Sequence, residues 1–599
     1  MAYLVEMGIT DNMLKNSQPE DNYGPTIGIS EEIHAMKYRS KGESFKDAMT
    51  RVAEALKDDD EHFDQFRDIL YNMRFMPAGR VQSAMGAPRR VTPYNCFVSM
   101  TIPDSMEGIM TAAQEAAKTM QLGGGIGYDF STLRPRGALI KGLDSRSSGP
   151  MSFMGIFDAV CKTISSAGHR RGAQMGVLRI DHPDIVEFIH AKNNSTVFTQ
   201  FNLSVGVTDA FMEAVKLDTD FDLVFEGRVY DTVNARALWD DVLRCTWDWA
   251  EPGILFIDRI NSKNNLHYCE YIAATNPCGE QPLPPNGACL LGSFNLVKYV
   301  YLNENGVYHF DYEKLKHDIP SVVRAMDNVV DRAVYPLPSQ ELEAKSKRRM
   351  GLGVTGVANA IEAMGHAYGS DGFLEILEEI MRIIRDTCYR TSVSLAIEKG
   401  PFPLYTEELL DSDFAVTLPE GIRSLVRKHG LRNSHLLSVA PTGTISLSAD
   451  NVSSGIEPVF SYGFDRTIQT YDGPRVERVE DYGYRVFGVS GAKADDLPVM
   501  AHVKVLNLAS KYVDSACSKT CNVGADVTWN EFKDVYMAAY DGGASGCTTF
   551  RASGKRYGIL NASSSEDVSP AVEEADNGDY VDEGGACYYD TATGLRQCE

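Results

Sequence analysis

Short β-like runs alternate with amphipathic helical stretches from residue 80 to about residue 560. In the run FNLSVGVTD (201–209), apolar residues occupy every second position, which is the period of a half-buried strand. A helix that Thr208 or Asp209 can cap follows this run. Strand–helix alternation over several hundred residues is typical of α/β proteins, so we predict that fold class.

The region before residue 76 is predicted to be helical. In GESFKDAMTRVAEAL (42–56), apolar residues recur at three- and four-residue spacing, Ser44 can cap a helix, and Asp47 can complete a capping box. We therefore predict an N-terminal helical region at 1–75 that precedes a main α/β unit at 76–560.

The last segment, 561–599, differs sharply in composition. Eight acidic residues fall within 566–583, and Lys and Arg are absent between Arg556 and Arg596. A run of like charges repels itself and disfavours a packed core, so we predict a flexible acidic tail. The tail nevertheless ends with Cys587 and Cys598, which are either functional or two idle cysteines at a disordered terminus.

Charge and composition exclude several classes of function. Lys and Arg total 58 against 82 Asp and Glu, and the resulting net charge of −24 argues against a general nucleic-acid binder or a protein of anionic membrane surfaces. The start of the chain lacks the features of a signal peptide, and we see no apolar run long enough for a membrane span. With twelve scattered cysteines, we expect a soluble protein of the reducing cytoplasm.

The most informative stretch is TNPCGEQPLPPNGACLLGSFNL (275–296). Its prolines and glycines disfavour a helix and indicate a rigid, extended loop. Alternate side chains of an extended chain share a face, so Asn276, Cys278 and Glu280 are expected to project together, with Cys289 following eleven residues after Cys278. A proline-stiffened surface loop with incidental polar residues is the alternative.

NPCGEQPL, followed by CLLGSFNL, resembles the finger loop of ribonucleotide reductases, in the form typical of the adenosylcobalamin-dependent class II enzymes. Further segments resemble this family in the same order along the chain. They are FMPAGR (75–80), YNCFVSM (94–100), GGGIGYDFSTLRPRGA (123–138), SSGPMSFM (147–154), HRRGAQMG and DHPDIVEFIHAK (169–192), FNLSVGVTD, APTGTIS and SSGIEPVF (440–460), and GCTTFRASGKR (546–556).

The resemblance implies a ten-stranded α/β barrel, built from two parallel five-stranded halves, with the finger loop at its centre. It implies that Cys278 carries a thiyl radical, that Glu280 takes the proton of the ribose 3′-hydroxyl, and that Asn276 holds the ribose hydroxyls. Cys96 and Cys289 correspond to the dithiol that becomes a disulfide in each turnover. By itself, Cys96 would be a small buried hydrophobic residue.

The resemblance also implies two nucleotide sites. Thr442, Gly443, Thr444, Ile445 and Ser446 of APTGTIS would bind the substrate diphosphate, although an ordinary helix cap would look similar. Asp104 and Arg134 would contact a deoxynucleotide triphosphate effector, and Arg170 and Arg171 would lie in the loop that relays effector identity. Asp104 has a simpler alternative as the N-cap of the following helix. GGGIG fits no dinucleotide fingerprint.

Adenosylcobalamin is the cofactor that the resemblance implies. Class I enzymes receive their radical from a metal-containing subunit through a tyrosine pair, and the matching positions here are Thr549 and Phe550. A class I-type large subunit remains the alternative enzyme, and a nucleotide-binding regulator without catalysis is the alternative from another class. Since Cys517 and Cys521 have no second pair at ligand spacing, we predict no metal site.

The resemblance implies several partners. They are a ribonucleotide substrate, expected to be a diphosphate, deoxynucleotide effectors, a thioredoxin- or glutaredoxin-like reductant and a second copy of the chain in a homodimer. We further predict that Cys587 and Cys598 relay reducing equivalents to the Cys96–Cys289 pair.

Overall fold

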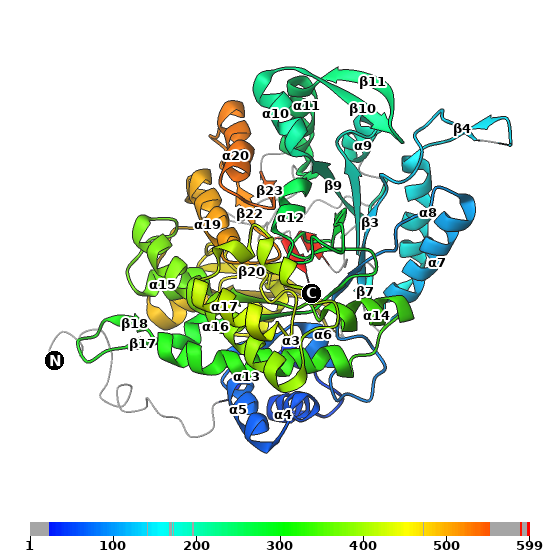
Figure 1. Ribbon diagram of the computed structural model, residues 1–599. Coiled ribbons are helices and arrows are strands. Elements are labelled where there is room, and N and C mark those ends of the chain that lie inside the picture. The colour runs from blue at the N-terminus through cyan, green and yellow to red at the C-terminus, as the bar shows by residue number, and fades with distance from the viewer. Residues whose placement is uncertain are drawn as a thin grey trace.

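The computed structural model describes most of the chain between residues 23 and 551 (Figure 1). Residues 141, 167–169, 172, 194–196 and 471–472 are outside this description, as are the side chains of 165–166, 170–171, 464–470 and 473–475. Beyond residue 551, only the backbones of 587–589 and 596–598 are described. Most of the predicted tail therefore lies outside the described residues.

Three helices form the start of the described chain, namely α3 (Gly28–Tyr38), α4 (Phe45–Leu56) and α5 (Asp60–Tyr71). The predicted capping box of α4 is confirmed: Ser44 accepts from the backbone of Asp47, whose carboxylate accepts from the backbone of Ser44. The boundary of a separate N-terminal region at residue 75 stays a prediction.

The largest sheet has eight strands, and five successive ones in the sheet run parallel. In sheet order the strands are β15 (Ala288–Cys289), β2 (Cys96–Val98), β3 (Gly125–Asp129), β8 (Gln174–Arg179), β9 (Phe201–Val207), β12 (Gly253–Phe256), β23 (Gly546–Phe550) and β22 (Thr520–Asn522). The parallel run extends from β2 to β12. At its two ends, β15 pairs antiparallel with β2 and β23 pairs antiparallel with β12. The predicted strand at FNLSVGV is confirmed as β9, and Thr208 caps the helix after it.

A second sheet contains β1 (Phe75–Pro77), β16 (Leu291–Asn295) and β19 (Gly351–Thr355), with β16 parallel to β19. Two isolated parallel bridges continue from it, Leu352 to Leu437 and Val439 to Cys517. Parallel strands need long crossovers, and helices provide them here.

The longer helices surround these sheets (Figure 1). They are α7 (Met106–Gln121), α8 (Pro150–Thr163), α10 (Asp209–Leu217), α11 (Ala235–Trp249), α13 (Tyr312–Arg332), α14 (Pro338–Lys347), α16 (Asp371–Lys399), α17 (Glu420–His429), α19 (Val499–Lys511) and α20 (Trp529–Asp541). Shorter helices are α6 (Gly79–Ala84), α9 (Ile185–Ile189), α12 (Ile257–Lys263), α15 (Val357–Ala363) and α18 (Gly443–Ser448).

Paired strands outside the two main sheets complete the fold. They are β4 (Leu139–Ile140) with β5 (Ser145–Arg146), β6 (Ser165–Ser166) with β7 (Arg170–Arg171), β10 (Asp220–Phe225) with β11 (Arg228–Asn234), β13 (Ala274–Thr275) with β14 (Pro282–Leu283), β17 (Val300–Leu302) with β18 (Tyr308–Phe310), β20 (Gly463–Thr470) with β21 (Gly473–Glu480), and β24 (Cys587–Tyr589) with β25 (Arg596–Cys598).

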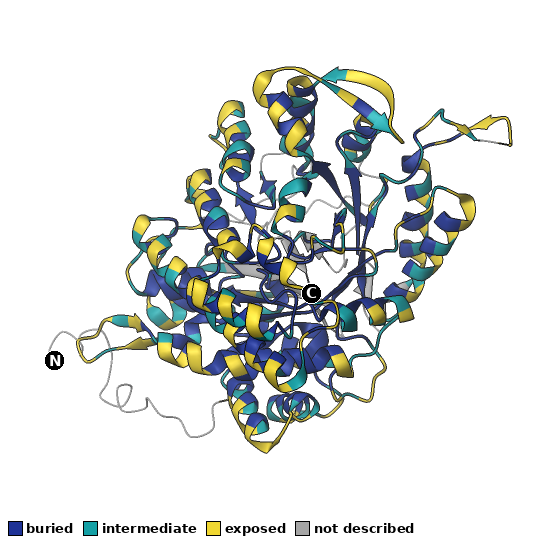
Figure 2. Ribbon diagram, in the orientation of Figure 1, coloured by how far each residue is buried: buried dark blue, intermediate teal, exposed yellow. Residues whose placement is uncertain are grey.

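The strands of the main sheets are buried, while the surrounding helices expose their outer faces (Figure 2). The predicted α/β class is confirmed in this form. Closure of ten strands into one barrel stays a prediction. Among the described residues, none of the helices combines the length and apolar character that a membrane crossing requires.

Candidate active site

The predicted finger loop is a buried hairpin. Strands β13 and β14 pair with Thr275 opposite Pro282, and the turn between them passes through Gly279, whose φ of +81° favours glycine. The expectation of a non-helical loop is confirmed. The alternative of a surface loop is wrong, because the turn lies among the buried strands.

Asn276 and Glu280 are in direct contact within this loop. The Asn276 amide donates to Glu280 Oε1 at 2.8 Å, and both residues are at most 1% exposed. The Asn276 carbonyl side-chain oxygen accepts from the backbone of Gln281 at 3.0 Å, which orients the amide toward the carboxylate. The Glu280 backbone carbonyl accepts from the Ser438 hydroxyl at 2.8 Å, and this contact ties the loop to the second half of the chain.

Cys278 lies at the turn of the loop and is 3% exposed. The predicted burial of this cysteine is therefore confirmed. Its sulfur takes part in a disulfide bond. This bond must be reduced before Cys278 can carry a thiol hydrogen.

Cys96 and Cys289 lie directly opposite each other on the antiparallel strands β2 and β15. Directly opposed residues have Cα atoms about 4.5–5.5 Å apart, within the range that a disulfide can span. Both cysteines are buried thiols. Burial, together with the nearby Glu280 carboxyl and Cys96, raises the pKa of Cys289 well above that of a free cysteine. The structure thus brings together two residues that are far apart in the sequence.

Glycines on the flanking strands make room for the loop. A Cβ atom on Gly125 would lie 3.2 Å from Cys96 Sγ, and one on Gly127 would lie 1.9 Å from the Thr275 carbonyl oxygen. On β19, a Cβ atom on Gly351 would lie 2.3 Å from Gln281 Nε2. The alternate glycines of GGGIG thus serve close packing, a role that the sequence interpretation missed.

Arg80 is a second residue that the sequence interpretation missed. Its side chain is buried, and within the described residues its Nε and Nη2 atoms have no hydrogen-bond partner. Burial lowers the pKa of Arg80 to about 10, against the opposing influence of Cys96. Arg80 packs against Gly123 and Cys96 Sγ packs near Gly125, so the buried cation lies close to Cys96.

The predicted phosphate segment forms a compact cluster of hydroxyl groups at the start of α18. Thr442 Oγ1 and Ser446 Oγ are 2.7 Å apart, and Thr355 Oγ1 lies within 2.8 Å of both. The backbone N–H of Gly455 donates to Thr442 Oγ1 at 2.7 Å. Thr444 is also buried, and Ile445 is partly buried against the core. Thr442 occupies the N-cap position of α18 but makes no side-chain cap hydrogen bond, since its hydroxyl contacts Thr355 and Ser446 instead.

Asp104 and Arg134 form an ion pair in which Arg134 Nε lies 2.6 Å from Asp104 Oδ2. Both side chains are about one quarter exposed. The alternative role of Asp104 as a helix N-cap is wrong, because Ser105 occupies that position and accepts from the backbone of Gly108. The backbones of Arg170 and Arg171 form β7, and their side chains lie outside the described residues.

The end of the chain returns to the hydroxyl cluster. Strands β24 and β25 pair with Cys587 opposite Cys598, and β25 packs against α18. The side chains of these two cysteines lie outside the described residues. On β23, Thr549 and Phe550 are buried, and Thr549 Oγ1 lies 2.8 Å from the hydroxyl of Tyr536 on α20.

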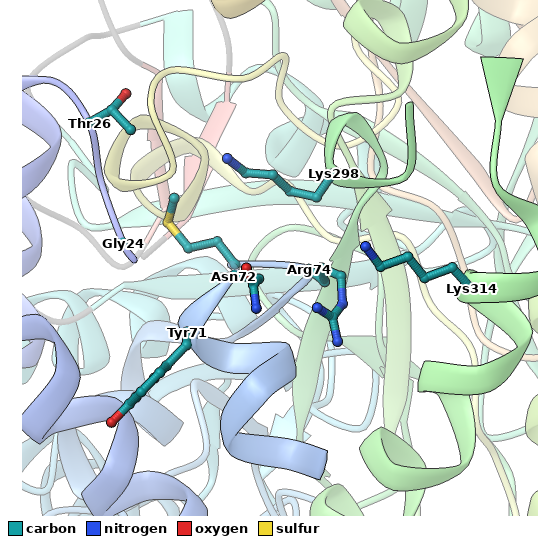
Figure 3. A pocket seen from close by; sticks show the side chains of 8 residues that line it. Gly24, Thr26, Tyr71, Asn72, Arg74, Lys298 and Lys314 are labelled. Carbon is teal, nitrogen blue, oxygen red and sulfur yellow. The ribbon is translucent and has the colours of Figure 1, made fainter. Parts of the chain in front are cut away.

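A separate cavity of about 160 Å³ lies between α5, α13 and the chain near Lys298 (Figure 3). Lys298 and Lys314 extend into it, and Arg74 beside them is paired with Asp318 and Asp68. It is lined by none of the predicted site residues.

Comparison with known proteins agrees with this geometry. A family model described as "Ribonucleotide reductase, barrel domain" matches residues 94–482. The vitamin B12-dependent ribonucleoside-diphosphate reductase of Thermoplasma acidophilum is 32% identical over 548 residues, which cover 86% of this chain and 68% of that protein. Its namesake from Mycobacterium tuberculosis (strain CDC 1551) is 33% identical over 543 residues, covering 86% and 75%.

A relative of another kind is the ribonucleoside-diphosphate reductase subunit alpha of Chlamydia pneumoniae. It is 27% identical over 460 residues, which cover 67% of this chain and 43% of that protein. The family match spans well over half of the chain and includes the finger loop and the hydroxyl cluster. The chain therefore belongs to the ribonucleotide reductase family.

Proposed function

We propose that this chain is an adenosylcobalamin-dependent ribonucleoside-diphosphate reductase that makes 2′-deoxyribonucleotides by thiyl-radical chemistry. The observation that carries the proposal is the buried constellation at the finger loop. Cys278, the bonded Asn276–Glu280 pair and the opposed Cys96 and Cys289 supply the groups that the reaction needs.

The catalytic roles follow from the chemistry of these groups. After reduction to a thiol and loss of its hydrogen atom to the radical source, Cys278 as a thiyl radical would abstract the 3′ hydrogen of the ribose, and Glu280 would accept the proton of the 3′-hydroxyl. Asn276 donates to Glu280 Oε1 and orients the carboxylate, the group that would accept the proton. As the 2′-hydroxyl leaves as water, Cys96 and Cys289 supply two electrons and two protons and become a disulfide.

A ten-stranded barrel around the finger loop is the architecture that we infer for this site. The segment 288–295 pairs through β15 with β2 and through β16 with β19. The bridges at Leu437 and Val439 continue from β19 toward β22. These pairings support two parallel halves that meet at β12–β23 and again at the segment 288–295.

The substrate diphosphate is proposed to bind at Thr442, Gly443, Thr444, Ile445 and Ser446. The Thr442 and Ser446 hydroxyls, which now bond each other, can turn to donate to phosphate oxygens. The named activity of the Thermoplasma and Mycobacterium relatives, on ribonucleoside diphosphates, supports this choice of substrate.

We infer adenosylcobalamin as the radical source because it can generate a radical beside the finger loop without a separate subunit. Gly279 approaches Leu255 on β12, which pairs with Gly546 at the start of β23, the strand that carries Thr549 and Phe550. A phenol pair for radical transfer is lacking at those two positions. When bound, adenosylcobalamin supplies a radical by homolysis of its cobalt–carbon bond. Cys278 would receive the radical, and the buried strands would exclude water from it.

We further infer that a deoxynucleotide triphosphate binds near Asp104 and Arg134, in a homodimer, and adjusts substrate choice through Arg170 and Arg171. Arg134 is about one quarter exposed, and its guanidinium has N–H groups beyond those that contact Asp104 and the Leu139 carbonyl, which can donate to a phosphate. A tail relay by Cys587 and Cys598 is supported by their opposed backbone positions in β24 and β25, since β25 packs on the α18 helix.

The test of the function is turnover of ribonucleoside diphosphates by the purified chain with dithiothreitol. We expect no product from the chain alone and full turnover with adenosylcobalamin. If turnover instead required a second, metal-containing subunit, the class I alternative would be correct. This alternative is favoured by one observation, the similarity to the Chlamydia subunit alpha.

The tail relay has its own test. Replacement of Cys587 and Cys598 by Ser should abolish turnover driven by thioredoxin and preserve turnover driven by dithiothreitol, because the small reductant can reach the buried dithiol directly. Equal activity of variant and parent with thioredoxin would show that the tail cysteines are idle.

A further inference from the structure

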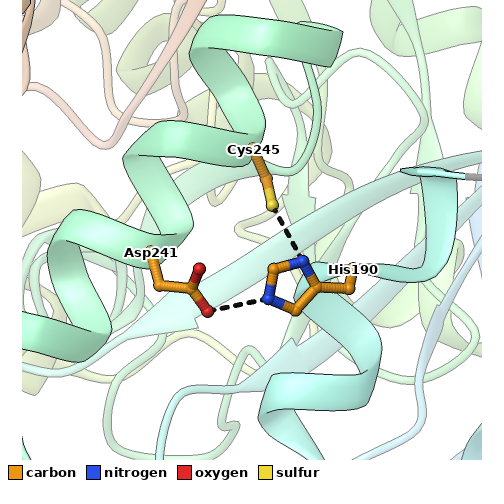
Figure 4. A group of neighbouring side chains, drawn as sticks. All are labelled: His190, Asp241 and Cys245. Atoms are coloured by element: carbon orange, nitrogen blue, oxygen red, sulfur yellow. Dashed lines mark hydrogen bonds and ion pairs between the residues drawn. The ribbon is translucent and has the colours of Figure 1, made fainter.

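A cysteine, a histidine and an aspartate meet on the outer side of the main sheet (Figure 4). Asp241 and Cys245 are one turn apart on α11, and His190 follows the end of α9. His190 Nε2 lies 2.9 Å from Asp241 Oδ2, and His190 Nδ1 lies 3.3 Å from Cys245 Sγ.

The hydrogen bonds define which ring nitrogen carries the proton. Asp241 accepts a hydrogen bond from Nε2, so the proton of the neutral imidazole is on that nitrogen. The side-chain amide of Asn193 donates to Nδ1 at 2.9 Å, which also requires a bare Nδ1. Once the exposed Asn193 amide turns away, Nδ1 can accept the thiol proton of Cys245, and Asp241 stabilises the imidazolium that results.

The same geometry argues against a metal ion held by all three residues. The imidazole turns its two nitrogens toward different partners, with Cys245 at Nδ1 and Asp241 at Nε2 (Figure 4). A cation bound at Nδ1 would therefore sit on the side of the ring away from the Asp241 contact. The described arrangement suits proton transfer better than shared coordination.

Polar side chains that are partly exposed to solvent cover the Cys245 thiol. The side chains of His190 and Asp241 are 40% and 37% exposed, and Cys245 lies directly beneath them with 4% exposure. The thiol therefore lies beneath two side chains that are themselves partly exposed. Two other cysteines provide a contrast, since burial raises the pKa of Cys161 to about 12 and also raises the pKa of the exposed Cys269.

We propose that Cys245 is a reactive thiol outside the finger-loop site, activated by His190 and positioned through Asp241, which hydrogen peroxide converts to a sulfenic acid. The thiolate sulfur attacks one peroxide oxygen, the O–O bond breaks and an S–O bond forms. Sulfur loses two electrons, the peroxide gains them, and the departing hydroxide takes the proton from His190 to leave as water. This proposal does not rest on the proposed reductase activity.

The experiment treats the full chain with hydrogen peroxide at one pH in the presence of dimedone, which traps sulfenic acids. Mass spectrometry of peptides then gives the rate at each cysteine. We expect Cys245 to be trapped faster than Cys161 and faster than the more exposed Cys269. His190→Gln should slow trapping at Cys245 by about tenfold, because the thiolate fraction falls toward that of an ordinary cysteine.

Matched variants separate activation from mere packing. Asp241→Asn should slow trapping at Cys245, Asp241→Glu should restore most of the rate, and neither should alter the rate at Cys269 or the melting temperature. The proposal would be overturned if Cys245 were trapped no faster than Cys161. It would also be overturned if the His190→Gln variant were trapped at Cys245 as fast as the parent or faster. It would also be overturned by a one-to-one zinc complex that each of Cys245→Ser, His190→Gln and Asp241→Asn abolishes, since the cluster would then be a metal site.

Discussion

Substitution of Gly127 by Ala tests whether the finger loop depends on the glycines of β3. The new Cβ atom would lie 1.9 Å from the Thr275 carbonyl oxygen, and real Cβ contacts are essentially never shorter than 3.0 Å. Loop and strand must therefore separate by at least 1.1 Å. Because Thr275 directly precedes Asn276, the proposed catalytic groups would move with it.

A misplacement of about 1 Å can lower a rate about 10²-fold, so we expect a loss of that order in kcat for Gly127→Ala. Overpacking of this kind also costs about 1–3 kcal/mol of folding stability. Gly206→Ala on β9 is the matched control, since its Cβ atom would lie 3.7 Å from the nearest atom, an ordinary contact.

The assay compares turnover with adenosylcobalamin and dithiothreitol for both variants, with thermal melting followed by circular dichroism. We expect near-parent kcat and melting temperature for Gly206→Ala. If Gly127→Ala folded and turned over as Gly206→Ala does, close packing of the loop against β3 would not control the geometry of the site.

Three further predictions concern single side chains. Glu280→Gln should retain substrate binding but lose about 10²–10⁴-fold in kcat, measured by steady-state kinetics beside equilibrium binding, because its proton transfer is lost. Arg80→Met should leave the melting temperature unchanged or higher, since it removes a buried guanidinium with two unbonded nitrogens. It should also slow alkylation of Cys96, because the positive charge of Arg80 stabilises the thiolate form of that cysteine. Burial raises the pKa of Glu362 to about 7, so the folded state keeps a proton that the unfolded state releases from about pH 4.5 upward. Stability should fall as the pH rises from about 4.5 to 7, and Glu362→Gln should remove that dependence of the melting temperature.

Local patterns in the sequence were sufficient for the elements that depend on neighbouring residues. The capping box of α4 needs only Ser44 and Asp47, three positions apart, and the strand β9 follows from alternation along one segment. The prolines and Gly279 likewise exclude a helix from the finger loop without reference to the rest of the chain. The α/β class follows because such local signals repeat.

Other features arise only where distant segments pack together. The sequence shows the three hydroxyl residues of APTGTIS directly. It does not show that Thr355 on β19, far away in the sequence, contacts Thr442 and Ser446. Asp104 looked like a helix cap, and only the fold brings Arg134 close enough to form an ion pair with it. Neither partnership has a local signature, because hydrogen bonds and charges act through space.

Residue type and short spacing were enough to predict the α/β class, the finger loop and the residues able to do chemistry. Which of these residues meet depends on how distant segments pack. Cys96 faces Cys289 because β2 pairs with β15, and Cys245 faces His190 because α11 packs against α9. The reason is physical: a cysteine's reactivity is set by the charges and donors within a few ångströms of its sulfur, and chain folding places those groups there.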